Sequence, residues 1–291
     1  MNKVIPSGIL LINKPSGITS HDVIDLLRKV FKKTKIGHSG TLDPMATGVM
    51  NILIGSATKL SDELTSKDKK YKVEMLLGVR TDTYDITGNV IEALPVNQDE
   101  IYIKERIKRF IGKQHQTPPI YSAIRIDGKR AYEYAREGQQ IDIESREVEI
   151  YDINDINVNL DTRIVSFVVH CSKGTYIRSL VNDIGIKIGC NSTMSSLERI
   201  ECGQTKIENS YKLYDFLNLN IDEMTNNIIN LETYYKESKA IYLNEIEFIK
   251  YQNGIELDIE TKNNIVRVYE NKRFTGLGKV TKNRLKRFII E

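Results

Sequence analysis

One carboxylate lies in a segment that is rich in glycine and hydroxyl side chains. Asp43 is part of residues 37–48, which read GHSGTLDPMATG. Pro44 directs Asp43 toward an extended backbone, and the glycines permit tight turns and close approach of a ligand. A loop of this kind can present a catalytic acid or base. A plain Asp-Pro turn is the alternative, and the segment alone favours it.

Two later segments could cooperate with such a carboxylate. Tyr71 follows a lysine-rich stretch, residues 67–70, where an aromatic ring among cations could stack on a nucleobase. The alternative for Tyr71 is a half-buried strand tyrosine. Arg178 stands at an expected helix start, in SKGTYIRSL (172–180), among apolar positions of the same helical phase. That phase favours a side chain directed inward, able to pair with a carboxylate through two hydrogen bonds.

Composition excludes several classes of protein. The chain has 291 residues, 40% hydrophobic and 28% charged, as expected of a globular protein of one large domain or two unequal ones. No apolar run approaches the roughly 20 residues that span a membrane, and the N-terminus does not resemble a signal peptide. We therefore expect a cytoplasmic protein. Its three cysteines, Cys171, Cys190 and Cys202, fit neither a disulfide framework nor a zinc site.

Charge is distributed unevenly along the chain. Residues 1–80 carry 13 basic against 7 acidic side chains, residues 81–260 carry 20 against 30, and residues 261–291 carry 9 against 2. The two ends are therefore basic and the middle is acidic. A polyanion that touches both ends would explain this distribution, and a solvated basic helix and tail would explain it equally well.

Hydrophobic periodicity predicts a mixed α+β fold. Thr19 and Asp22 form a possible capping box at the start of a helix. Strands and helices mix without a regular βαβ rhythm, which favours a largely antiparallel central sheet flanked by helices. The expected strands cover residues 8–13, 49–54, 71–79, 122–126, 146–153 and 164–171, and the expected helices cover residues 22–31, 103–111, 131–136 and 177–188.

A domain boundary is expected near residue 236. The helix-like segment 231–237 gives way there to a short remainder that reads as strands with turns at 253–254 and 276–278 and ends in a basic stretch. We therefore expect a catalytic domain over residues 1–235 and a small C-terminal domain over residues 236–291.

The segment around Asp43 resembles the catalytic motif of the TruB-type tRNA pseudouridine synthases. The resemblance continues through the step into Tyr71, through KGTYIRSL around Arg178, and through Leu197. It implies a pseudouridine synthase fold, followed by a small β-barrel of the PUA type that binds RNA.

The resemblance also implies roles for single residues. Asp43 is the catalytic aspartate, and Tyr71 stacks on the target base and assists proton transfer at carbon 5. Arg178 is the partner of the aspartate, and it is counted with Asp43 and Tyr71 as catalytic. The implied substrate-binding residues are His38, Tyr71, Tyr176 and Leu197.

Other family segments carry weaker expectations. Glu198 and Ile200 depart from the family pattern around Leu197, which puts a phosphate contact at 198 in doubt. Lys14-Pro15 resembles a step that packs against the aspartate loop. Residues 117–123 and the loop around Asp85 are interpreted as scaffold and RNA contact, without a chemical role.

The implied activity is isomerisation of one uridine, position 55 in tRNA numbering, in the T-arm loop of tRNA. The base must be flipped out at a cost of about a few kcal/mol. No cofactor or metal is expected, because no group is consumed and the four histidines are scattered. The expected partner is the T-arm stem-loop, without a guide RNA and without a membrane, and we expect a monomer. Three alternatives stay open: a dyskerin-like, guide-dependent synthase, a non-catalytic RNA-binding or RNA-folding module, and a hydrolase that uses Asp43 with His38.

Overall fold

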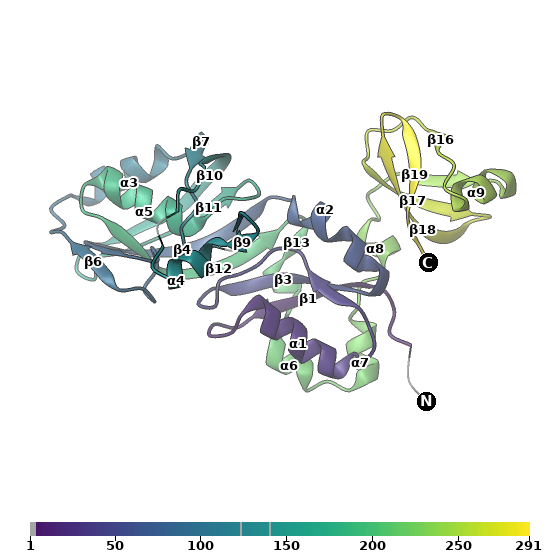
Figure 1. Cartoon of the computed structure of the whole chain (residues 1–291), viewed down its shortest axis with the longest axis horizontal. Coiled ribbons are helices and arrows are strands. Elements are labelled where there is room, and N and C mark those ends of the chain that lie inside the picture. The colour runs from purple at the N-terminus through teal and green to yellow at the C-terminus, as the bar shows by residue number, and fades with distance from the viewer. Residues whose placement is uncertain (1–3, 123, 140) are drawn as a thin grey trace.

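The computed structural model describes residues 4–122, 124–139 and 141–291. One long mixed sheet forms the body of the molecule, and a small five-stranded sheet forms its C-terminal part (Figure 1). The strands of the long sheet, in spatial order, are β14 (Tyr211–Lys212), β1 (Gly8–Lys14), β3 (Thr47–Ile54), β12 (Ser192–Cys202), β4 (Lys69–Leu77), β11 (Ile164–Cys171), β10 (Arg146–Asn159) and β7 (Gly112–Gln116), with β2 (Ile36–His38) on β3 and β13 (Thr205–Lys206) on β12.

Strand β12 joins the two halves of the long sheet. It pairs in parallel with β3 and in antiparallel register with β4, so residues near 200 lie between the strand that follows Asp43 and the strand that contains Tyr71. The β1–β14 pair is also parallel, and the remaining pairs of this sheet are antiparallel. The predicted α+β fold with a mostly antiparallel mixed sheet is confirmed.

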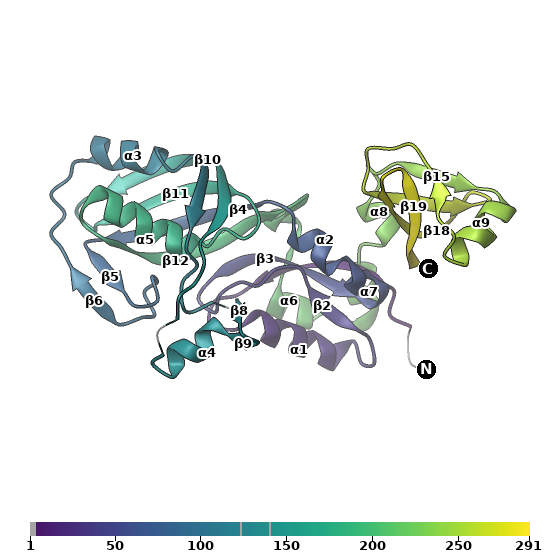
Figure 2. The same ribbon diagram turned by 45° about the horizontal axis from the view of Figure 1, so that its top comes forward.

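Helices cover the long sheet separately on its two halves (Figure 1, Figure 2). Near β1 and β3 lie α1 (Ser20–Val30), α6 (Leu213–Leu217), α7 (Ile221–Asn226), the short 3-10 helix η1 (Gly55–Leu60) and α2 (Ser61–Thr65). Over the other half lie α3 (Glu100–Lys108) and α5 (Ile177–Ile188). The capping box predicted at Thr19 and Asp22 is present at the start of α1. Apolar side chains of both halves form one continuous core.

Two small ribbons extend from the second half. Strands β5 (Val79–Thr81) and β6 (Val90–Ala93) form one, and β8 (Arg125–Ile126) with β9 (Lys129–Arg130) forms the other, followed by α4 (Ala131–Arg136). The expected strand 71–79 is divided at Gly78, whose φ of +86° ends β4 before β5 begins. The expected strand 122–126 was too long, since only Arg125–Ile126 is extended and paired; Ala123 lies outside the described residues.

Strands and helices elsewhere differ in length from the expectation. Strand β10 continues to Asn159, well beyond residue 153. Its full length was not predicted, because bulges in its pairing with β11 break the alternation of apolar and polar residues that marks a strand in sequence. Helix α3 begins earlier, with Asp99 as its N-cap, and ends at Lys108, ahead of Gly112.

The C-terminal sheet has the spatial order β15 (Ala240–Leu243), β17 (Ile265–Glu270), β18 (Arg273–Thr281), β19 (Arg284–Ile290) and β16 (Leu257–Asp258). It curls into a half-barrel that is consistent with a PUA-like domain. The predicted turn at residues 253–254 is present, but it follows a helix that was not predicted, α9 (Glu245–Gln252). The predicted turn at residues 276–278 was wrong, because these residues lie inside β18, where Gly276 and Gly278 admit close approach of β19.

Helix α8 (Leu231–Tyr234) connects the two parts of the chain. An apolar cluster crosses the connection. It contains Leu53 and Leu60 from the first part, Tyr234 from α8, and Leu277 and Ile289 from the half-barrel. The C-terminal half-barrel therefore packs against the first part through buried apolar surface.

Candidate active site

The loop between β2 and β3 presents Asp43. Leu42 and Ala46 beside it are buried, and the Asp43 carbonyl accepts a hydrogen bond from the Ala46 amide at 3.0 Å. Ser20 in the first turn of α1 binds both the amide and the carbonyl of Leu42. These anchors leave the Asp43 side chain 33% exposed. The expected glycine-punctuated loop is therefore a fixed turn whose carboxylate faces outward.

Lys14 lies beneath this loop and is fully buried. Its ammonium group donates to the carbonyls of Pro15 at 2.8 Å, Ile18 at 2.7 Å and Pro44 at 3.2 Å. Burial lowers the pKa of Lys14 to about 8, and the negative charge of Asp43 acts in the opposite direction. The expected packing of Lys14-Pro15 against the aspartate loop is present, with the Pro44 carbonyl as the contact.

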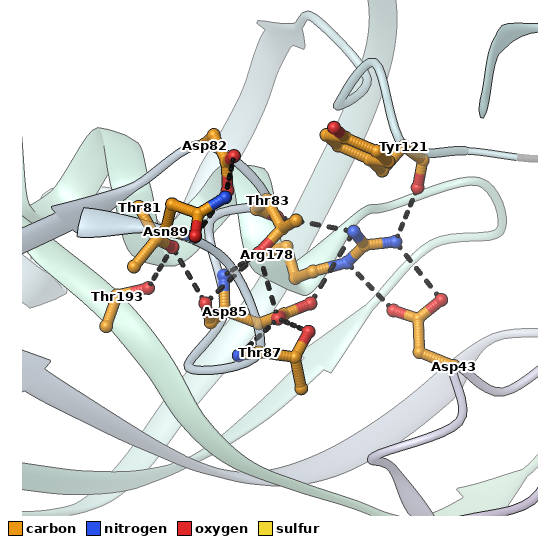
Figure 3. A network of polar contacts seen from close by, with 10 residues as sticks. All are labelled: Asp43, Thr81, Asp82, Thr83, Asp85, Thr87, Asn89, Tyr121, Arg178 and Thr193. Atoms are coloured by element: carbon orange, nitrogen blue, oxygen red, sulfur yellow. Dashed lines mark hydrogen bonds and ion pairs between the residues drawn. The ribbon is translucent and has the colours of Figure 1, made fainter. Parts of the chain in front are cut away.

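Arg178 meets Asp43 through two of its nitrogen atoms (Figure 3). Its Nε lies 2.8 Å from Oδ2 of Asp43, and its Nη2 donates to Oδ1 at 3.1 Å. The two residues are 135 positions apart in the chain. Only 7% of the Arg178 side chain is exposed, so this ion pair is screened by solvent mainly on the aspartate side. The predicted contact between these two groups is present in the structure.

The start of α5, which carries Arg178, is held by the end of β7. The side-chain amide of Gln116 accepts from the Tyr176 N–H at 2.8 Å and donates to the Tyr176 carbonyl at 3.0 Å. Ser179 donates to the Thr117 carbonyl at 2.8 Å. Tyr176 is the N-cap residue of α5 and has no capping hydrogen bond from its side chain. The family segment that begins at Thr117 therefore positions the arginine helix.

Further contacts fix the guanidinium of Arg178. Nη2 also donates to the Tyr121 carbonyl at 2.9 Å, and Nη1 donates to the Thr83 carbonyl at 3.3 Å. Nη1 lies 3.6 Å from Oδ2 of Asp85, a carboxylate whose side chain is only 6% exposed. Arg178 thus stands between two carboxylates, one exposed and one buried (Figure 3).

The loop between β5 and β6 supplies Asp85. Its Oδ1 accepts from the Thr83 hydroxyl at 3.0 Å and from the amide and the hydroxyl of Thr87. The Asp85 carbonyl accepts from the Thr81 hydroxyl, which also contacts the Thr193 hydroxyl on β12 at 2.9 Å. This network ties the loop to the central strand of the sheet. Sequence interpretation assigned the loop around Asp85 to scaffold and RNA contact and missed its pairing with Arg178. The dense Thr and Asp content of residues 81–87 was the available signal.

Tyr71 and Leu197 share one face of the sheet near the Asp43 loop. Tyr71 on β4 is 8% exposed and pairs with Arg199, two residues along β12 from Leu197, which is 7% exposed. Burial raises the pKa of the Tyr71 hydroxyl strongly, and the positive charge of Arg199 acts in the opposite direction. Tyr71 is therefore a neutral phenol at neutral pH. The burial of Tyr71 agrees with the alternative interpretation of a strand tyrosine. Its ring nevertheless lies on the strand next to Leu197 and Arg199.

His38 and Tyr176 belong to different elements, at the end of β2 and at the start of α5. His38 ends β2, and burial lowers the pKa of its imidazole, with the charge of Arg199 adding to the effect. Its Nδ1 is buried and has no hydrogen-bond partner among the described residues. The guanidinium of Arg146 lies 4.8 Å from the centre of the Tyr176 ring. A neutral imidazole with an unpaired buried nitrogen suits a hydrogen bond to a ligand better than an ion pair.

Two negative findings concern the described part of the chain. Residues 4–122, 124–139 and 141–291 contain no cluster of His, Cys, Asp and Glu side chains arranged to hold a metal ion. Over the same residues no helix combines the length and the apolar character required to cross a membrane.

Comparison with known proteins identifies the family. A family model described as "TruB family pseudouridylate synthase (N terminal domain)" matches residues 28–177, which contain Asp43, Tyr71 and Tyr176. The chain belongs to the TruB family. A tRNA pseudouridine synthase B from Clostridium tetani is 41% identical over 96% of this chain and 98% of its own length. Another, from Francisella tularensis, is 35% identical over 98% of this chain and 94% of its own length.

Solved structures confirm the fold of this TruB family member. A Cbf5-Nop10-Gar1 complex contains a chain with a TM-score of 0.70 and 24% identity, over 98% of this chain and 83% of that one. A structure of an H/ACA RNP bound to a substrate RNA gives a TM-score of 0.69 at 23% identity, over 97% of this chain and 83% of that one. At this identity the likeness establishes the pseudouridine synthase fold.

Proposed function

We propose that this chain converts uridine 55 in the T-arm loop of tRNA to pseudouridine, with Asp43 as its catalytic carboxylate. The observation that carries the proposal is the two-point contact of Asp43 with buried Arg178, within a chain of the TruB family. Relatives with 35–42% identity over nearly the whole chain are named tRNA pseudouridine synthase B. The reaction is an isomerisation of RNA, and it needs no external group.

The proposed reaction breaks one bond and forms another within the same nucleotide. The bond from the ribose carbon C1′ to N1 of the base breaks, the base turns, and C1′ bonds to carbon 5. The proton displaced from carbon 5 leaves, and N1 gains a proton. Asp43 acts on the ribose or on the ring, and covalent attack and proton abstraction both use the same carboxylate. Arg178 keeps the carboxylate in place, since two contacts fix both its oxygens.

The remaining side chains bind and orient the flipped nucleotide in this proposal. Tyr71 stacks on the base and passes on the carbon-5 proton; as a neutral phenol it can accept a proton only while giving up its own. Leu197 packs against the base, Tyr176 lines the pocket, and His38 donates or accepts a hydrogen bond to the RNA. Stacking returns roughly 1–3 kcal/mol per base, which offsets the cost of flipping.

We also propose the domain division and setting of the enzyme. Residues 1–235 carry the catalysis and residues 236–291 form a PUA-like domain that contacts RNA, which the basic balance of residues 261–291 supports. The enzyme acts as a monomer in the cytoplasm, without a guide RNA. The near-complete coverage of relatives named for tRNA supports a free tRNA substrate.

The test uses an unmodified tRNA transcript and no guide RNA. Purified wild-type protein is expected to form pseudouridine at position 55 alone, whereas Asp43→Asn is expected to bind the transcript with unchanged affinity and form no product. Asp161→Asn, in the exposed turn between β10 and β11, is the matched control and should retain activity.

Each outcome separates the candidate functions. Product from Asp43→Asn would dismiss Asp43 as the catalyst. Binding without product from the wild type would favour a non-catalytic RNA module, and product only after addition of a guide RNA would favour a guide-dependent synthase.

A further inference from the structure

Arg199 is a buried cation that the proposed mechanism does not use. It lies on the central strand β12 and is one of the largest fully buried side chains, with only 1% of its surface exposed. Buried charges are usually paired with an opposite charge, because an unpaired one is costly. The hydrogen bonds of Arg199 go instead to the backbone carbonyls of Val49, Thr41 and Gly40, at 2.8, 3.4 and 3.3 Å.

These three carbonyls lie on both sides of Asp43. Gly40 and Thr41 precede Asp43 in the β2–β3 loop, and Val49 follows it on β3. One guanidinium therefore connects the start of the loop, at Gly40 and Thr41, with the strand that follows it, at Val49. The planar group presents its N–H donors in fixed directions, so it restrains the loop in position as well as in distance.

Sheet pairing fixes Arg199 itself. It pairs with Gly48 across β12–β3 and with Tyr71 across β12–β4. Gly48 has a φ of +114°, and a Cβ there would lie 2.3 Å from the Arg199 carbonyl oxygen, so the two backbones are in direct contact. The positive charge of Arg199 also acts on the pKa of the Tyr71 hydroxyl, lowering it against the effect of burial. The guanidinium that holds the aspartate loop thus belongs to the residue paired directly with the tyrosine that is proposed to stack on the base.

We propose that Arg199 is a positioning residue that sets the geometry of Asp43 relative to Tyr71. This inference rests on the proposed function. Arg199 reaches the Asp43 side chain only through the loop backbone, whereas Arg178 contacts the carboxylate directly. Arg178 orients the carboxylate group, and Arg199 sets the height of the whole loop above the sheet.

The test is Arg199→Met, which keeps most of the volume and removes the charge and the donors. At saturating tRNA the rate of a single turnover is expected to fall about 100-fold, because displacement of a reacting group by about 1 Å has that effect. The dissociation constant for tRNA should stay within about twofold, since no RNA contact is removed. Arg267→Met is the matched control: Arg267 also holds a backbone carbonyl, that of Ser238 at 3.2 and 3.1 Å, but on the C-terminal half-barrel.

Arg267 lies in the part of the chain that is proposed to contact RNA, so Arg267→Met tests only the rate at saturating tRNA. It should lower thermal stability and leave that single-turnover rate unchanged, whatever its effect on tRNA affinity. If Arg199→Met instead keeps the wild-type rate, or loses rate only in proportion to its folded fraction, the positioning role is wrong. Inactive wild-type protein would mean that the proposed function itself fails.

A second variant guards against loss of folding. Arg199→Lys keeps the charge but cannot reach three carbonyls with a fixed fork of donors, so it is also expected to turn over at least about tenfold more slowly with unchanged tRNA affinity. Arg199→Ala should regain part of its rate when millimolar guanidinium ion is added, whereas methylammonium should not restore it. Full activity of Arg199→Lys, or equal rescue by both ions, would overturn the proposal.

Discussion

At the scale of single residues, the site is organised around cations that hold backbone or carboxylate oxygens. Arg178 contacts Asp43 and Asp85, and Lys14 and Arg199 hold carbonyls of the Asp43 loop. Asp43 itself is the most exposed of these charged groups. The reactive carboxylate can therefore meet RNA, while the groups that fix it are buried. Their contacts are stronger in the protein interior than they would be in water.

Lys14 is expected to make the rate of catalysis depend on pH. Its ammonium group has three N–H donors for three carbonyls, and its pKa is lowered to about 8. Above that pH the neutral amine has one donor fewer, so the Pro44 anchor loosens. The single-turnover rate is expected to fall as pH rises through about 8, and rates measured from about pH 7 to 9 at saturating tRNA check this. Lys14→Met should be slow throughout, without this decline.

The stability of the fold should respond in the opposite direction. Between about pH 8 and 10.5 the unfolded chain retains a proton that folded Lys14 has released, so this group raises the free energy of unfolding with increasing pH. A parallel loss of rate and of stability in the wild type would point to general unfolding and contradict the assignment to Lys14.

At the scale of elements, close contact between β3 and β12 holds the Asp43 loop against the sheet. The parallel pair is short, covering Thr47 with Glu198 and Gly48 with Arg199. Its closeness depends on a glycine, since any side chain at position 48 would meet the backbone of β12.

Gly48→Ala is expected to be destabilising beyond the strain of its backbone angle. Gly112 has nearly the same φ, +115° against +114°, but a Cβ there would meet no atom within 4 Å. Gly112→Ala therefore measures the strain alone. Gly48→Ala should lower the free energy of unfolding by about 1–3 kcal/mol more, because the clash forces two strands apart. Urea denaturation of the two variants measures this difference. Equal losses in the free energy of unfolding would show that β3 and β12 move apart without destabilising the fold.

Elements with regular periodicity were predictable from sequence, and those shaped by distant partners were not. Helices α1 and α5 carry apolar side chains at helical spacing, and the capping box of α1 is local. Helix α9 was missed because its buried residues Phe248 and Tyr251 are few and its exposed face carries Ile246 and Ile249.

The site was predictable where residues carry a family motif. Asp43 and Arg178 were expected to meet, and they do. The Thr and Asp content of residues 81–87 indicated a polar network but not its partner, because the pairing of Asp85 with Arg178 depends on the path of the β5–β6 loop over β12. The role proposed for Arg199 depends in the same way on a sheet register that no local pattern reveals.

At the scale of the whole molecule, the two parts of the chain share a core. Leu277 and Ile289 of the half-barrel belong to the same buried cluster as Leu53 and Leu60 of the first part. A second cluster, which contains Val266 and Leu285, lies within the C-terminal part alone. The half-barrel is thus attached through apolar burial as well as through the chain.

Two leucine substitutions separate docking from folding of the half-barrel. Leu277→Ala and Leu285→Ala each remove a side chain that is 0% exposed, at an expected cost of about 2–5 kcal/mol. Leu277→Ala should also accelerate amide hydrogen exchange in β3 and η1, whose apolar side chains it covers, whereas Leu285→Ala should accelerate exchange only within residues 236–291. Exchange in β3 that is insensitive to Leu277→Ala would contradict a shared core.

The place of β12 between β3 and β4 bears on how the protein matures during synthesis. The strands on either side of it are made early, but residues 192–202 are synthesised only after about two thirds of the 291 residues have been translated. Until then the two halves of the sheet have no strand to connect them, and Asp43 and Tyr71 have no common support. A chain that stops before this strand is therefore expected to be inactive on RNA.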